Sequence, residues 1–135
     1  ENLDETTRTL MGTGIYECHA NITEADLKDG NSWTIDLGDV RESARVYVND
    51  SLVGCAWAVP YRLDFSGLLH KGDNIIRIEV TNLPANRISQ LDREGVQWRK
   101  FEEINIVDLH YKRTTYEGWD PVPSGLNSAI KLLKR

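Results

Sequence analysis

Apolar and polar residues alternate with a period of two through much of the chain, which predicts β-strands. Four segments show this most clearly, at residues 14–22, 33–37, 44–49 and 74–82. Successive side chains of a strand point to opposite faces, so each segment has one apolar and one polar face. The residues expected to point inward are Tyr16, Cys18, Ala20, Ile22, Trp33, Ile35, Leu37, Ala44, Val46, Val48, Ile76, Ile78 and Val80. Strands that are wet on one face bury the other against a second sheet.

Turn residues separate these strands, and the intervening segments are short. Asn49-Asp50 follows Val48 at a point where a tight hairpin needs residues with positive φ. We expect a short helix or turn at 64–69, a short helix at 86–95, and further strands at 104–112 and 129–133. The sequence therefore predicts an all-β fold, a two-sheet antiparallel β-sandwich or jelly roll, with residues 1–135 forming a single domain.

Composition narrows the class of partner. The 135 residues are 40% apolar and 27% charged, with a formal net charge of -5. That balance disfavours nucleic acid and anionic membranes, which attract basic surfaces. No apolar run reaches the length of a membrane span, so we predict none. The polar start without an initiator Met leads us to interpret the chain as a piece of a longer protein or as a processed form.

Motifs for metal, nucleotide or nucleophile chemistry are missing from the sequence. The three histidines, His19, His70 and His110, stand apart, and no Gly-x-Ser-x-Gly or phosphate-binding loop occurs. We therefore predict no cofactor, and leave open a structural calcium ion held by backbone carbonyls and carboxylates. We interpret Cys18 and Cys55 as small buried thiols, with a disulfide as the alternative in an oxidising compartment.

Aromatic residues are the most informative candidates for a binding surface. The chain has four Trp and five Tyr, and an aromatic ring offers a flat partner to the apolar face of a sugar. Trp33 alternates with Ile35 and Leu37 and is expected in the core. The carbohydrate-binding candidates, all at strand ends or in loops, are Trp57, Tyr61, Asn86, Arg87, Trp98 and Trp119. The alternative is that the aromatic residues close the ends of the sandwich and that Arg87 pairs with Asp92.

An ordered series of motifs resembles the sugar-binding jelly-roll domains of glycoside hydrolase family 2 and its relatives. WTIDLGDV at 33–40 is followed by ARVYVN at 44–49, then by Gly54, Trp57, Pro60-Tyr61, Asp64, Gly72-Asp73-Asn74 and IEVTN at 78–82. The continuation is similar to the C-terminal domain of large bacterial α-L-rhamnosidases of the family 106 type, in ANRI at 85–88, Trp98, Trp119 and PSGL at 123–126. The series departs from the family at its hairpin glycine, which is Asp50 here, and in its closing segment, 124–130.

The resemblance implies a galactose-binding-like fold and a non-catalytic module of a large, exported glycoside hydrolase, secreted, periplasmic or at the cell surface. Its partners would be an oligo- or polysaccharide and the catalytic domain of the parent enzyme, which carries the catalytic carboxylates; none is assigned in this chain. Three hypotheses follow: a carbohydrate-binding module, a structural domain that braces the catalytic domain, and a small glycosidase in its own right.

Overall fold

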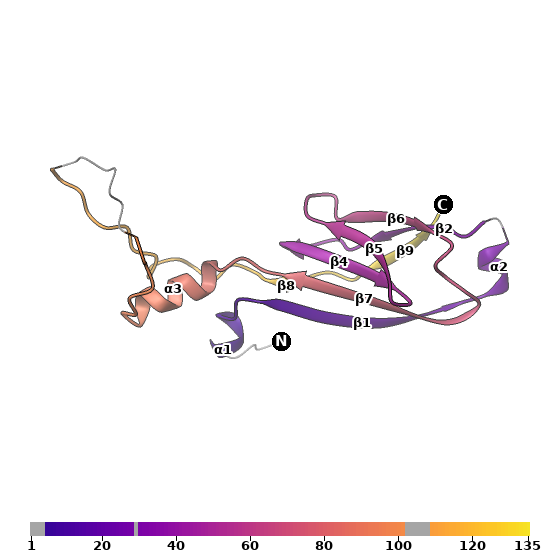
Figure 1. Ribbon diagram of the computed structural model, residues 1–135, viewed down its shortest axis with the longest axis horizontal. Coiled ribbons are helices and arrows are strands. Elements are labelled where there is room, and N and C mark those ends of the chain that lie inside the picture. The colour runs from indigo at the N-terminus through magenta and orange to yellow at the C-terminus, as the bar shows by residue number, and fades with distance from the viewer. Residues whose placement is uncertain (1–4, 29, 102–108) are drawn as a thin grey trace. The chain divides into compact units, whose positions relative to one another are not determined.

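The computed structural model describes residues 5–28, 30–101 and 109–135 (Figure 1). The chain packs as two compact units. The first, which we call the sandwich unit, is Gly12–Leu83 with Pro123–Arg135. The second, which we call the helical unit, is Glu1–Met11 with Pro84–Val122. The single domain that we expect over 1–135 stays a prediction.

The described residues of the sandwich unit form nine strands and one short helix. They are β1 (Thr13–Ile22), α2 (Glu24–Leu27), β2 (Ser32–Asp36), β3 (Val40–Arg41), β4 (Ser43–Val48), β5 (Ser51–Ala56), β6 (Arg62–Ser66), β7 (Gly72–Thr81), β8 (Gly125–Leu126) and β9 (Lys131–Lys134). One antiparallel sheet has the order β1-β7-β4-β5 and a second has the order β6-β2-β9 (Figure 1). The short strands β3 and β8 form a third pair.

The core lies between the sheets and consists of the inward residues that alternation predicts, with additions from the loops. Its buried members are Ile22, Trp33, Ile35, Leu37, Val40, Ala44, Val46, Val48, Ala56, Tyr61, Phe65, Leu69, Ile76, Ile78 and Val80. The expected core position of Trp33 is thus confirmed, with its indole N–H donating to Asn31. Tyr16 is an exception, because it is 39% exposed near the start of the edge strand β1.

The expected hairpin joins β4 to β5 through Asn49 and Asp50, which have φ values of 47° and 64°. Both values are in the left-handed region that a two-residue hairpin of this kind requires. Asn49 is further fixed because its side chain donates to the Leu68 carbonyl and accepts from the Ile75 amide. Asp50 makes no such side-chain bond within the described residues, so no hydrogen bond offsets the strain of its positive φ.

We expect Asp50→Gly to stabilise the protein by up to about 1 kcal/mol, since glycine adopts positive φ without a steric penalty. Asp50→Ala is the matched control and should lower stability by about 1 kcal/mol, because alanine has the same Cβ and no side chain that tolerates this region. Urea unfolding measures both. A destabilised glycine variant would contradict this explanation of the hairpin.

Ser128, in the C-terminal segment, stabilises the turn that follows β2. The Ser128 hydroxyl accepts from the Asp39 amide at 2.6 Å and donates to the Leu37 carbonyl at 3.1 Å. Gly38, with φ of 64°, lies so close to Ser128 that a side chain at this position would overlap the hydroxyl. After this contact β9 pairs with β2, as the strand expected at 129–133 requires.

The helical unit contains α1 (Glu5–Arg8) and α3 (Ala85–Arg93). The helix that we expect at 86–95 is therefore confirmed as α3. The segment 64–69 differs from expectation: its first residues belong to strand β6, in which Leu63 and Phe65 alternate with polar residues. Two apolar positions are too few to separate a strand from a turn. The expected strand at 104–112 lies mostly outside the described residues, and 109–112 form a turn and irregular chain.

The two cysteines are free thiols and differ in exposure. Cys18 lies on the inner face of β1, where burial raises the pKa of its thiol. The interpretation of Cys55 as a buried thiol is wrong, because it is exposed on the outer face of β5. β1 and β5 are the two edges of the four-stranded sheet, so the thiols are separated by two strands.

Candidate functional site

The two candidate residues in the sandwich unit have opposite environments. Trp57 follows the end of β5 and is 76% exposed, which is unusual for a residue type that is highly buried on average. Tyr61 is only 8% exposed and belongs to the core, and its carbonyl accepts a hydrogen bond from the Leu37 amide. Only Trp57 therefore has a ring available to a ligand.

Asn86 connects three segments of the helical unit from the first turn of α3. Its side-chain amide donates to the carbonyls of Arg8 and Val122, at 3.0 and 2.8 Å. Its side-chain oxygen accepts from the Val122 amide at 2.8 Å. Because the residue is buried and these groups are already bonded, Asn86 holds the unit together.

Arg87 and Asp92 do not form the ion pair that we consider as an alternative. The guanidinium group of Arg87 donates to Gln90, one turn further along α3, at 2.8 Å. Asp92 instead points toward the segment that follows the helix, so the expected pair is wrong. Residues three apart on a helix are neighbours, which explains why Gln90 is the partner.

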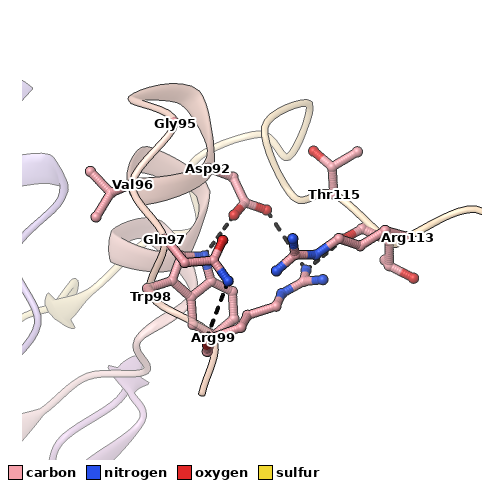
Figure 2. A pocket seen from close by; sticks show the side chains of 9 residues that line it. Asp92, Gly95, Val96, Gln97, Trp98, Arg99, Arg113 and Thr115 are labelled. Carbon is pink, nitrogen blue, oxygen red and sulfur yellow. Dashed lines mark hydrogen bonds and ion pairs between the residues drawn. The ribbon is translucent and has the colours of Figure 1, made fainter. Parts of the chain in front are cut away.

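Asp92 is the centre of the helical unit's polar interactions. Its carboxylate accepts from the Trp98 indole N–H at 2.6 Å and from the Tyr116 backbone N–H at 2.8 Å. Figure 2 shows the carboxylate between Trp98 and the guanidinium groups of Arg99 and Arg113. The N–H of Tyr116 and the indole N–H hold the pKa of Asp92 below its usual value, and the two positive charges add to this effect. The carboxylate is therefore ionised and links α3 to two later segments.

Arg99 covers one part of the Trp98 ring. Its guanidinium carbon is 5.0 Å from the Trp98 ring centroid and 5.2 Å from that of Tyr116. A guanidinium N–H of Arg99 donates a hydrogen bond to the Thr114 carbonyl. A pocket of about 250 Å³ adjoins this group, lined by Asp92, Gly95, Val96, Gln97, Trp98, Arg99, Arg113, Thr114 and Thr115 (Figure 2). The N–H of Trp98 is bonded to Asp92 and its ring adjoins Arg99, so the main role of Trp98 is to stabilise the helical unit.

Trp119 extends the same aromatic cluster toward solvent. Its ring centroid is 4.5 Å from that of Tyr116, with the two planes tilted by 57°. Half of the residue's surface is exposed. Among the predicted aromatic site residues, Trp57 and Trp119 are thus the two that are exposed, whereas Trp98 is partly buried and Tyr61 is buried. Tyr116 and Asp92 were not among the predicted site residues, and no local motif marks either one, since their partners are brought together by the fold.

We expect the bonds around Asp92 to be lost in acid. Because the folded pKa is lowered, the stabilisation is present above the unfolded value of about 3.9 and disappears as pH falls through the folded value. Tryptophan fluorescence between about pH 5 and 2 should therefore change, and Asp92→Asn should remove that step. Trp98→Phe is the matched control for the fluorescence signal. An identical acid transition in Asp92→Asn would contradict this role.

Two negative observations concern only the described residues. Within 5–28, 30–101 and 109–135, no group of three or more His, Cys, Asp or Glu side chains clusters as metal ligands would. No helix in the same ranges has the length and apolar character of a membrane span.

Two antiparallel sheets with a common apolar core define this protein as an all-β sandwich. A family profile described as "Glycosyl hydrolase 2 galactose-binding domain-like" matches residues 4–130. The chain belongs to this family, and the resemblance seen in its motifs is confirmed.

The relatives are large glycosidases. The chain is similar to a protein of Formosa agariphila named "Putative beta-glucuronidase", with 28% identity over 145 residues that span 96% of this chain and 12% of that protein. Among solved structures, a rhamnosidase from Novosphingobium sp. PP1Y matches with a TM-score of 0.71 and 30% identity, over 98% of this chain and 12% of that one. A beta-D-glucuronidase from Dictyoglomus thermophilum matches with a TM-score of 0.51 and 28% identity, over 58% of this chain and 14% of that one.

The chain therefore spans about one eighth of the length of these relatives. Such a share is that of a small domain within a large glycoside hydrolase. The sandwich unit makes up roughly three fifths of the chain, similar to the 58% covered by the Dictyoglomus enzyme.

Proposed function

We propose that this chain is a non-catalytic, carbohydrate-binding accessory domain of a glycoside hydrolase. The observation that carries the proposal is the family match over residues 4–130 in a chain that spans only 12% of its large glycosidase relatives. Exposed Trp57 and Trp119 support the binding role, because each offers a flat apolar surface on which a sugar ring can stack.

Two carboxyl groups, those of Asp36 and Asp92, do not have the properties of a catalytic acid. A glycosidase needs one carboxylic acid whose raised pKa keeps it protonated, opposite a second carboxylate. Asp36 and Asp92 are shifted the other way: backbone N–H groups of Gly38 and Tyr116, respectively, lower their pKa values. Both carboxylates are already engaged in holding turns and loops, so neither is suited to donate a proton to a leaving sugar.

A purely bracing role is the second candidate, and one observation favours it. Tyr61, Asn86 and Trp98 use their polar groups or rings within their own units. On this hypothesis the exposed aromatic residues contact the catalytic domain and bind no glycan. The two roles differ in what the chain does when it is separated from that domain.

Calorimetric titration with a panel of neutral and acidic oligosaccharides separates these functions. We expect weak binding, with dissociation constants of about 1 mM, corresponding to roughly -4 kcal/mol, and no turnover of aryl glycosides. Absence of heat and of any tryptophan fluorescence change with every glycan would reject binding and leave the bracing role. Turnover that one Asp or Glu substitution abolishes would instead establish a small glycosidase.

We further propose that the parent enzyme is exported, to act in the medium, the periplasm or at the cell surface. Polysaccharides are too large and too polar to cross a lipid bilayer unaided, so an enzyme that degrades them has to meet them outside the cytoplasm. Fractionation of the source cells with an antibody against this chain tests the location. Recovery of the full-length enzyme in the cytosol alone would refute it.

A further inference from the structure

The outer face of the four-stranded sheet carries a polar groove of about 350 Å³ that the motifs do not reveal. It is lined by Thr13, Ser43, Arg45, Cys55, Glu79 and Thr81. All six belong to the sandwich unit, and they come from all four strands of the sheet. A volume of this size lies in the range of small-molecule sites.

The strand register explains why these residues meet. Thr81 of β7 pairs with Thr13 on one side and with Ser43 on the other, which forms one row across three strands. In the next outward-facing row, Arg45 of β4 lies between Glu79 and Cys55. Side chains of paired residues stand on the same face of a sheet, so the two rows form the floor of the groove.

The groove offers several kinds of hydrogen-bonding group. The hydroxyls of Thr13 and Thr81 bond to each other at 2.8 Å, which leaves lone pairs on both oxygens. Arg45 is exposed, and within the described part of the chain its guanidinium has no hydrogen-bond partner. Glu79 is fixed by Arg77, whose guanidinium stacks on Tyr47 at 4.0 Å. A ligand here would meet the Glu79 carboxylate as a fixed acceptor and the Arg45 guanidinium as a donor whose N–H groups are unused.

The charges of the lining favour a neutral ligand. Arg45 and Glu79 are direct cross-strand partners, so a ligand meets one positive and one negative group side by side, and Glu79 is also paired with Arg77. A sugar hydroxyl is both donor and acceptor, and a ring with adjacent hydroxyls can bond an arginine fork and a carboxylate together. A strongly anionic ligand would lie against the Glu79 carboxylate, which repels it.

Trp57 follows β5, the strand whose Cys55 lines the groove. The last pair between β4 and β5 is Ala44 with Ala56, and Trp57 is the next residue along the chain. Alternation places it on the same side as Cys55, with Ala56 buried between them. The indole is 76% exposed and is two residues from Cys55 of the groove lining, so its ring is available to a ligand bound there.

We propose that the outer groove binds a pyranose unit of a neutral glycan, with Arg45, Glu79 and the two threonine hydroxyls bonding its hydroxyls and Trp57 stacking on its apolar face. This inference deepens the proposed function and rests on it. It assigns carbohydrate binding to the sandwich unit, through a sheet face rather than through the helical unit's aromatic cluster.

Nuclear magnetic resonance titration of the ¹⁵N-labelled chain tests the site. The probes are methyl glycosides of neutral hexoses and 6-deoxyhexoses, with methyl glucuronide as the acidic comparison. We expect a neutral glycoside to shift the backbone amides of Ser43, Arg45, Cys55, Glu79 and Thr81. Trp57→Ala and Arg45→Ala should each weaken its binding about tenfold, a change of roughly 1.4 kcal/mol. Thr81→Val keeps the side-chain shape and should weaken it severalfold.

Phe101→Ala is the matched control, because it removes an 88% exposed aromatic ring of the helical unit and should leave that binding unchanged. Trp119→Ala tests the competing aromatic surface of the same unit. Binding that survives Trp57→Ala and Arg45→Ala but is lost in Trp119→Ala would overturn the groove and leave the proposed function standing. Stronger binding of the glucuronide than of every neutral glycoside would overturn the assignment of a neutral ligand. A wild-type chain that binds none of the probes, nor any oligosaccharide by calorimetry, would overturn the proposed function together with the groove. The spectrum of each free variant shows directly whether it is folded.

Discussion

Replacement of Ile35 by alanine should lower the free energy of unfolding by about 2–5 kcal/mol. Ile35 is on β2, the central strand of the three-stranded sheet, and none of its surface is exposed. Its loss removes apolar contacts and leaves a cavity that neighbours on two paired strands restrict from collapsing. Since domains of this size are stable by only about 5–15 kcal/mol, the variant loses a large part of its stability.

Urea unfolding followed by circular dichroism measures this effect, with the midpoint falling and the slope unchanged. Ile35→Val removes one methyl group and should cost about 0.5–1.5 kcal/mol. Ile15→Ala on the outer face of β1, where Ile15 is 67% exposed, should stay within about 0.5 kcal/mol of wild type. Equal effects of Ile35→Ala and Ile15→Ala would show that β2 does not have the central place described.

Asn74 is the second position where we expect a large effect, because its fully buried side chain joins four parts of the sandwich unit. Its side-chain oxygen accepts from the Asn49 side chain at 2.8 Å and from the His70 amide at 3.0 Å. Its amide nitrogen donates to the carbonyls of His70 and Gly72, at 2.8 and 2.9 Å, and more weakly to that of Ala20. Asn74→Ala should cost about 3 kcal/mol or more, since each buried group left without a partner costs about 1–3 kcal/mol.

Asn74→Asp distinguishes hydrogen bonding from packing. Aspartate has nearly the same shape, but it replaces a donor by a charged acceptor that faces carbonyl oxygens. Repulsion and burial would raise the folded pKa of the new carboxyl group, so its penalty should be large at neutral pH and shrink as pH falls through that value. Exposed Asn21 provides the control, and Asn21→Ala should be nearly neutral. A mild, pH-independent effect of Asn74→Asp would mean that only the volume of Asn74 matters.

The carbohydrate-binding role and the outer groove imply different roles for the two units. The sandwich unit would bind sugar with a sheet face whose polar residues are held in register by the ladder. The helical unit, with Asp92 and Asn86 bonded internally, would supply a defined surface of its own, including half-exposed Trp119. Rigid strands position binding groups more precisely than loops do, which favours the groove as the place of recognition.

The sequence determined the four strands β1, β2, β4 and β7 and which of their faces is buried. Alternation identifies Ile35, Val46 and Ile78 as inward, and all three are buried, because the period of two is a property of the strand itself. The positive φ at Asn49 was predictable for the same reason, since a two-residue hairpin imposes it locally. The ordered motifs also sufficed to identify the family, which the match over residues 4–130 confirms.

Only the tertiary structure decided which of the candidate residues face solvent. Trp57 and Tyr61 are four positions apart in one loop-like stretch, yet one is exposed and the other is in the core. Asn86 is engaged by Arg8 and Val122, which are 78 and 36 positions away. The outer groove likewise depends on the order β1-β7-β4-β5, which brings Thr13 beside Thr81. Local patterns set the direction of a side chain along a strand, whereas its partners come from strand order and long-range pairing, which no local period encodes.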